Sequence, residues 1–218
     1  MRESTREILN ELVLRYPSIE VCKNEIDQAV ESLIACFNLD GKLLACGNGG
    51  SAADCEHIVG ELMKAFLLKR RLEPEKQSRI RSMYPEDADV LIQNLQRAVP
   101  AISLVSQTAL MTAFGNDASS QLLFAQQVLS YGRPGDVLLA ISTSGNSSNI
   151  LYAAQIARLQ GVKIIGLTGE NGGKLKALCD VAICVPASLT YQIQELHLPV
   201  YHCLCACVEN ELFGGDEK

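Results

Sequence analysis

The chain has 218 residues, of which 48% are hydrophobic and 20% are charged, a composition typical of an ordinary folded domain. Its formal net charge of −6 argues against a nucleic-acid-binding surface, because neutralising phosphates needs a dense field of Lys and Arg. Charges run through the first twenty residues and no eighteen apolar residues follow one another, so we expect no secretory signal, no membrane span and a cytoplasmic location.

The nine cysteines do not indicate disulfides or a metal site. None belongs to a C-x-x-C pair, and the expected reducing compartment favours free thiols. Cys203, Cys205 and Cys207 alternate at two-residue steps, which points successive helical side chains to different flanks and suits a single metal poorly. We expect them to be buried as small hydrophobic side chains.

Two helical stretches are predicted before the first strand, one within residues 2–15 and one over about 18–38. The second has apolar residues at three- and four-residue steps, which is typical of an amphipathic helix. Residues 1–39 therefore form an expected N-terminal helical segment outside the sheet. Such a segment either caps the domain or packs on a partner subunit, and a subunit contact is our preferred interpretation.

Five short apolar runs are too brief for independent helices. They lie at residues 42–47, 101–106, 136–142, 163–169 and 181–186. Each is apolar throughout, and segments of helical period separate most of them, which indicates parallel strands buried on both faces. The sequence therefore predicts an α/β fold with a five-stranded parallel sheet.

Two further segments are not part of these runs. Residues 67–99 form a polar interval with two prolines, which we interpret as an insertion-like excursion that ends in a short helix. A connection of this length is often functional or mobile, so a lid, a subunit contact and a solvated loop are all compatible with it. The last long helix is predicted from about Thr190 to Phe213, with a kink at Pro199.

Two loops that follow predicted strands carry residue types suited to phosphate. The first, GNGGS at residues 47–51, lets backbone approach a ligand closely, although a tight turn with no ligand explains it equally well. The second, STSGNSSN at residues 142–149, offers several hydroxyl donors at a helix N-terminus, which favours phosphate over a simple cap. Neither loop has a nucleotide-binding pattern, so we expect a small phosphorylated metabolite and no nucleotide cofactor.

The three histidines are the other candidates for chemistry. His57 and Glu61 stand four residues apart on the helix after GNGGS, where they could bind a metal or transfer protons. An ordinary surface pair is the alternative. His197 and His202 lie on the last helix, and periodicity does not decide which of them is functional.

Four segments together resemble the phosphoheptose isomerases of the SIS (sugar isomerase) family, in order and over most of residues 40–213. They are GNGGSAADCEHIVGEL, AISTSGNSSNILYAA, LTGENGGKL and IQELHLPVYHCLCACVENELF. The resemblance implies a single SIS domain over residues 1–218, a flavodoxin-like three-layer αβα sandwich, and a homotetramer whose active sites use more than one subunit. The implied reaction converts sedoheptulose 7-phosphate to D-glycero-D-manno-heptose 7-phosphate by proton transfer between C1 and C2 through an enediol-type intermediate.

The resemblance also implies roles for matching residues. Glu61 would be the base that moves the carbon-bound proton, and His202 would exchange protons with the sugar oxygens. The implied substrate and phosphate contacts are Asn48, Gly49, Gly50, Ser51, Asp117, Ser142, Thr143, Ser144, Ser147 and Gln194. In some members a zinc ion occupies the site, and the matching ligands are His57, Glu61, Gln194 and His202. Gln194 and His202 lie about 12 Å apart along one helix, so a kink or a second subunit would have to help them converge.

Three other functions are weighed against this one. A non-enzymatic SIS tetramer that binds the replication initiator lacks the acid of the His-x-x-x-Glu pair and the downstream His, so Glu61 and His202 favour catalysis. A SIS transcriptional regulator is set aside, because the roughly forty residues before the first strand are too few for a DNA-binding module. An isomerase of another ketose phosphate stays an alternative, since the 67–99 connection is long for the family and Tyr191 stands where an acid is common.

Overall fold

The structure is a computed structural model and describes residues 1–215. One sheet of five parallel strands has the order β2-β1-β3-β4-β5. The strands are β1 (Leu43–Cys46), β2 (Ala101–Ser103), β3 (Val137–Ile141), β4 (Lys163–Thr168) and β5 (Val181–Cys184). All five predicted strands are confirmed, although β2 ends three residues earlier than expected. The strand order is also that of the predicted flavodoxin-like fold.

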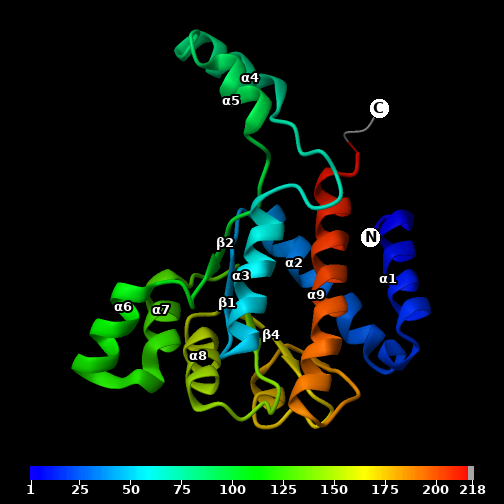
Figure 1. The fold of residues 1–218 in the computed structure, drawn as a ribbon, viewed down its shortest axis with the longest axis vertical. Helices are drawn as coiled ribbons and strands as arrows, with labels where there is room; N and C mark the ends of the chain where they lie inside the picture. The colour runs from blue at the N-terminus through cyan, green and yellow to red at the C-terminus, as the bar shows by residue number, and fades with distance from the viewer. Residues whose placement is uncertain (216–218) are drawn as a thin grey trace.

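Helices cover both faces of the sheet (Figure 1). One layer holds α2 (Lys23–Asn38), α3 (Gly50–Met63) and α9 (Thr190–Phe213), with α1 (Glu3–Arg15) packed outside it, and the other holds α7 (Leu123–Tyr131) and α8 (Ser148–Leu159). Successive strand residues face opposite layers, as Leu43 and Leu44 do in β1. The result is the predicted three-layer αβα sandwich, with one apolar core on each side of the sheet.

Shorter elements complete the chain. They are the 3₁₀ helices η1 (Pro17–Cys22), η3 (Ser120–Leu122) and η4 (Lys176–Leu178), the α-helix α6 (Thr108–Phe114) and the π-helix η2 (Gly115–Ser119). The second predicted helix thus begins as a 3₁₀ segment with Pro17 at its first position. Leu9 and Leu12 of α1 pack into the same core as α9, so the N-terminal segment caps its own chain. Whether its outer face also meets a partner subunit stays a prediction.

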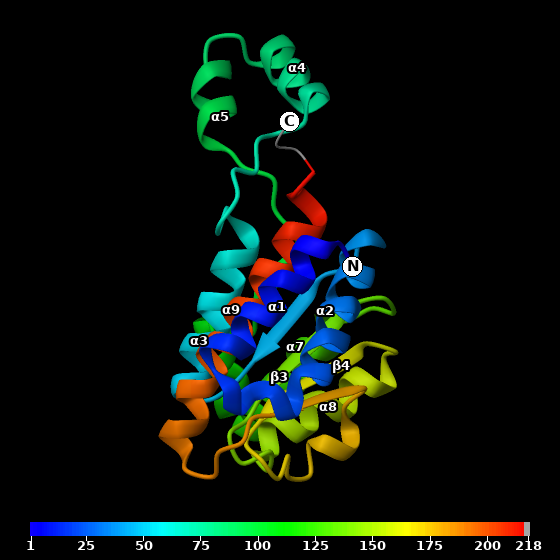
Figure 2. The same ribbon diagram turned by 90° about the vertical axis from the view of Figure 1, so that its right-hand side faces the viewer.

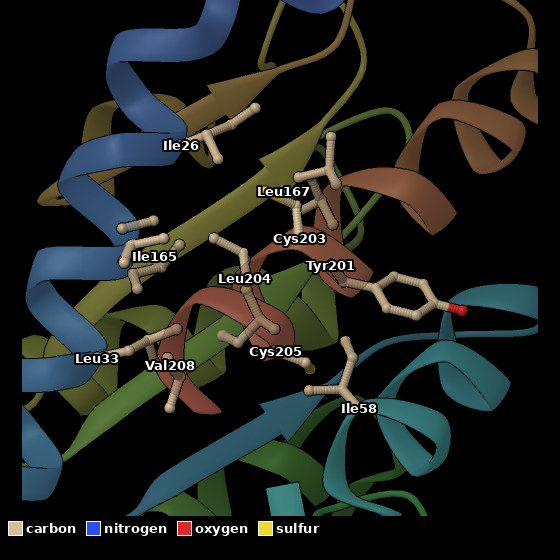
Figure 3. Close-up of a cluster of buried hydrophobic side chains, with 14 of the residues drawn as sticks. Ile26, Leu33, Ile58, Ile165, Leu167, Tyr201, Cys203, Leu204, Cys205 and Val208 are labelled. Atoms are coloured by element: carbon tan, nitrogen blue, oxygen red, sulfur yellow. The ribbon is translucent and has the colours of Figure 1, made fainter. Parts of the chain in front are cut away.

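Helix α9 runs without interruption over its predicted bounds, with Pro199 inside it. Figure 3 shows its side chains surrounded by Leu33 of α2, Ile58 of α3 and Ile165 of β4. Its three alternating cysteines are buried, and all nine cysteines of the chain are free, as predicted. Burial raises the pKa of Cys205 to about 12, which keeps this thiol protonated at neutral pH.

The excursion differs from its prediction, because it contains two helices where one was expected. Helices α4 (Pro74–Met83) and α5 (Ala88–Asn94) form a unit that we call the helical hairpin, and it stands away from the sheet in both views (Figures 1 and 2). Helix α4 buries none of its residues, so it has no apolar stripe from which a period could be read. The signal that could have found it is Pro74 at the first helical position followed by Glu75.

No helix among residues 1–215 is both long enough and apolar enough to cross a membrane.

Candidate active site

The two predicted phosphate loops meet at the carboxyl edge of the sheet. They follow β1 and β3, which are neighbours in the sheet, and the chain leaves these strands in opposite directions. Such a switch point opens the crevice in which parallel α/β sheets bind ligands. The loops are joined by two side-chain amides: Asn48 Nδ2 donates to Asn149 Oδ1 at 2.9 Å, and Asn149 Nδ2 donates to Asn48 Oδ1 at 2.8 Å. Sequence reasoning had not singled out Asn149.

The first loop needs glycine for two separate reasons. Gly49 precedes α3 with φ 58° and ψ −122°, a conformation that side chains rarely adopt. A Cβ atom on Gly50 would lie 2.6 Å from Nε2 of Gln194, so this amide packs directly on the loop backbone. Ser51 is buried in the first turn of α3. The structure therefore brings Gln194 of α9 to the first loop, and its contact with a substrate stays a prediction.

The second loop turns its serines toward the N-terminus of α8. Ser142 Oγ lies 3.2 Å from Ser147 Oγ, and Ser144 Oγ accepts a hydrogen bond from the backbone N–H of Asn146 at 3.1 Å. The backbone carbonyl of Thr143 accepts from Gly169 N at 3.0 Å, which ties the loop to the turn after β4. The loop thus combines hydroxyl donors with the dipole of a twelve-residue helix, an arrangement that favours an anion.

Asp117 is a predicted contact whose carboxylate has no hydrogen bond to either loop within the part of the chain that the structure describes. It is exposed in η2, and its carboxylate accepts a hydrogen bond from Nδ2 of its neighbour Asn116 at 3.0 Å. Figure 1 shows the turn between α6 and α7 at the left edge of the molecule, away from the start of α3. Its role in phosphate binding stays a prediction.

Three ionisable side chains from two helices gather beside the loops, and we call them the His57–Glu61–His202 cluster. His57 Nε2 lies 3.3 Å from Glu61 Oε1, and Lys64 Nζ lies 2.7 Å from Glu61 Oε2. The ring centroids of His57 and His202 are 5.0 Å apart, with an interplanar angle of 84°. Helix α9 therefore presents His202 to the face of α3 that carries the predicted His-x-x-x-Glu pair.

The structure decides which histidine of α9 can reach this site. His197 is fully buried in the core, and burial lowers its pKa to about 4, so this imidazole is neutral and structural. His202 faces the cluster, and burial, followed by the nearby His57, lowers its pKa as well. The Nε2 atom of His202 is buried and has no hydrogen-bond partner within residues 1–215. Its hydrogen-bonding capacity is therefore not used by the described residues.

Tyr201 and Asp54 are site residues that sequence reasoning missed. The Tyr201 hydroxyl lies 3.1 Å from Nδ1 of His57. Burial raises the pKa of the Asp54 carboxyl, and interaction with Tyr201 partly offsets that rise. Figure 3 shows this hydroxyl pointing from the core of the molecule toward α3. The contact crosses from one helix to another, so no local spacing could have revealed it.

Comparison with known proteins agrees with this architecture. The model of the SIS domain family matches residues 16–99 and 91–169. The chain is 40% identical over 191 residues to the phosphoheptose isomerase of Rhodospirillum rubrum. The aligned residues cover 88% of each of the two chains. The chain belongs to the phosphoheptose isomerase family of SIS-domain proteins.

Solved structures of the family have the same fold. The phosphoheptose isomerase of Neisseria gonorrhoeae superposes with a TM-score of 0.72 and 33% identity, covering 95% of this chain and 98% of the other. The phosphoheptose isomerase of Francisella tularensis gives a TM-score of 0.74 and 31% identity, covering 95% and 94%. The family fold therefore extends over nearly the whole chain.

The four predicted zinc ligands do not fit one ion as they stand. No group of three His, Cys, Asp or Glu side chains among residues 1–215 is arranged to hold a metal. His57 Nε2 faces Glu61, whose second oxygen is held by Lys64, and Gln194 packs on Gly50. A bound zinc ion therefore stays a prediction.

Proposed function

We propose that this chain is an aldose–ketose isomerase that converts sedoheptulose 7-phosphate to D-glycero-D-manno-heptose 7-phosphate. The observation that carries the proposal is the His57–Glu61–His202 cluster. Two of its members lie on α3, the helix that begins at the first loop of phosphate-binding type. Relatives named phosphoheptose isomerase support the substrate class. A purely initiator-binding role would leave this cluster without a purpose.

The spacing within the site favours a long sugar phosphate. Ser51 and Glu61 are ten residues apart on α3, which is about 15 Å along the helix axis. An extended seven-carbon sugar with a terminal phosphate spans a distance of this order once its contacts at both ends are included. We infer that the phosphate lies at the loops and that C1 and C2 lie beside Glu61.

The loops supply the proposed phosphate contacts. Hydroxyl groups of Ser51, Ser142, Thr143, Ser144 and Ser147 and backbone N–H groups at the starts of α3 and α8 would donate hydrogen bonds. Asn48, Gly49 and Gly50 would hold the backbone close to the substrate, and Gln194 would contact its polyol chain. Mutual hydrogen bonds between the loops keep these donors in place before a ligand arrives.

The proposed reaction moves two protons and needs no net oxidation. The Glu61 carboxylate removes a proton from C1 of the ketose, which leaves an enediolate with its charge on O2. His202 then takes the O1 proton and returns it to O2, and the protonated Glu61 delivers its proton to C2. Because the pKa of His202 is lowered by burial, its imidazole is neutral at neutral pH and can accept the O1 proton.

We further propose a homotetramer whose active sites use more than one subunit. A groove of about 460 Å³ opens beside His202 between α1 and α9, and its walls include Leu12, Arg15, Phe66 and Leu198. A partner subunit seated there would close one side of the site. A cytoplasmic location is also proposed, because nine free thiols suit a reducing compartment.

The test is turnover of sedoheptulose 7-phosphate, followed by NMR, in the wild type and in Glu61→Gln and His202→Asn variants. We expect each variant to lose activity by about 10²-fold to 10⁴-fold, with the fold intact by circular dichroism. Glu56→Gln is the matched control, because Glu56 is an exposed carboxylate on the same helix that bonds Ser106. A wild type that binds the sugar phosphate without converting it would contradict the proposal.

Metal content read on the same samples tests the zinc prediction. Bound zinc that is lost in His57→Ala would support the proposed ligand set. Full turnover by metal-free protein would contradict a requirement for the ion.

A further inference from the structure

A buried polar network links the two helices that carry the His57–Glu61–His202 cluster. Arg70 and Glu209 are 2% and 1% exposed, and Arg70 Nε lies 2.7 Å from Glu209 Oε1. Taking both charges out of water is costly, so a buried ion pair is weak evidence for a stabilising role. The contacts of this pair point to another role.

Glu209 holds the segment that follows α3. Its two carboxylate oxygens accept hydrogen bonds from the backbone N–H groups of Phe66 at 2.8 Å, Leu67 at 2.7 Å and Leu68 at 3.1 Å. Glu209 lies seven residues after His202, which is about two turns along the same face of α9. The ring of Phe66 in turn lies 5.7 Å from the ring of His202. Glu209 therefore fixes one of the side chains that pack against His202.

Arg70 holds the end of α3 itself. One terminal nitrogen donates to the backbone carbonyl of Leu62 at 2.7 Å, and the other donates to that of Glu61 at 2.9 Å. These carbonyls belong to the last turn of α3, where a helix has no internal partners for them. Figure 1 shows the segment after α3 crossing to the upper part of α9, where Arg70 meets Glu209.

We propose that Arg70 and Glu209 are positioning residues of the isomerase site, which fix Glu61 on α3 against His202 on α9. The inference rests on the proposed function. Proton transfer depends steeply on geometry, so a shift of about 1 Å between the two groups costs on the order of 100-fold in rate. The planar fork of arginine bonds one carboxylate and two carbonyls at once, which the single ammonium of lysine cannot reproduce.

The experiment compares Arg70→Lys and Glu209→Gln with Asp136→Asn. Asp136 is also a buried acid that pairs with Lys42 at 2.6 Å and accepts two backbone N–H groups, but these contacts hold the start of β3 and involve neither α3 nor α9. We expect all three variants to unfold at lower temperature. At a temperature where all are folded, kcat should fall about 10-fold to 100-fold in the first two, with KM for the sugar phosphate changed less than about threefold. Asp136→Asn should keep the wild-type kcat.

A second readout is independent of turnover. The imidazole NMR signals of His202 sense the rings of Phe66 and Tyr201, the second at 4.9 Å, so they should shift in Arg70→Lys but not in Asp136→Asn. A kcat loss no larger than that of Asp136→Asn, with unmoved imidazole signals, overturns the inference while the isomerase stands. Absence of turnover in the wild type overturns the proposed function, and the imidazole signals then decide the positioning role alone.

Discussion

His197 and His202 are five residues apart on α9, and their surroundings make one structural and the other a candidate catalyst. The pKa of His197 is about 4 in the folded chain and near 6.5 when the chain is unfolded. The unfolded state therefore binds the proton first as pH falls. The contribution of neutral His197 to the free energy of unfolding is fully present above about pH 6.5. It is lost as the pH falls toward 4, which lowers the free energy of unfolding by up to about 3 kcal/mol.

Urea unfolding of the wild type and His197→Gln at pH 7.5 and pH 5 checks this prediction. The wild type should lose more free energy of unfolding between the two conditions than the variant, because only the wild type gains a proton at this position on unfolding. An equal loss in both proteins would show that other groups cause the acid sensitivity.

The conformation of one glycine, Gly145, determines the shape of the second loop. Gly145 has φ 62°, and a Cβ atom there would lie 2.0 Å from the carbonyl oxygen of Gly172. We expect Gly145→Ala to cost about 1–3 kcal/mol of stability and to raise KM for the sugar phosphate. Gly60→Ala is the control, because a Cβ on this residue of α3 meets nothing within 4 Å and should stabilise by up to about 1 kcal/mol. Thermal unfolding and steady-state kinetics measure both effects.

The helical hairpin contributes little to the core. Only Ala88 is buried across α4 and α5, whereas the chain at its base is held by Arg97 N donating to Arg70 O at 2.8 Å. We expect replacement of residues 74–94 by a short Gly-Ser turn to leave the unfolding temperature of the body nearly unchanged. If the hairpin acts as a lid, the same variant raises KM while the body stays folded. A large drop in unfolding temperature would contradict the expected independence.

At the scale of the whole molecule, the proposed tetramer depends on apolar side chains at the groove beside His202. Light scattering should give four times the 23.7 kDa chain mass. Leu198→Asp, in the groove wall, should lower both the mass and the turnover, because a charge there opposes subunit contact. Leu159→Asp is the control, since Leu159 is 77% exposed on the other helical layer. A fully active monomer would contradict the proposal.

Local patterns were enough to predict much of this architecture. Apolar runs predicted all five strands, and the bounds of α9 were correct at both ends. Periodicity and apolar runs report burial, so they succeed where an element has a face in the core. Helix α4 has no buried residue, and the pattern therefore missed it.

By itself, the sequence determined the fold class, the two loops and the His-x-x-x-Glu pair, because each depends on neighbours along the chain. The resemblance had singled out His202, and the tertiary structure placed its ring beside His57 while it buried His197 in the core. The tertiary structure alone revealed the bonds of Tyr201 to His57 and of Arg70 to Glu209. These pairs join residues more than a hundred positions apart, and their contact is set by how α3 and α9 pack on the sheet, which no local spacing encodes.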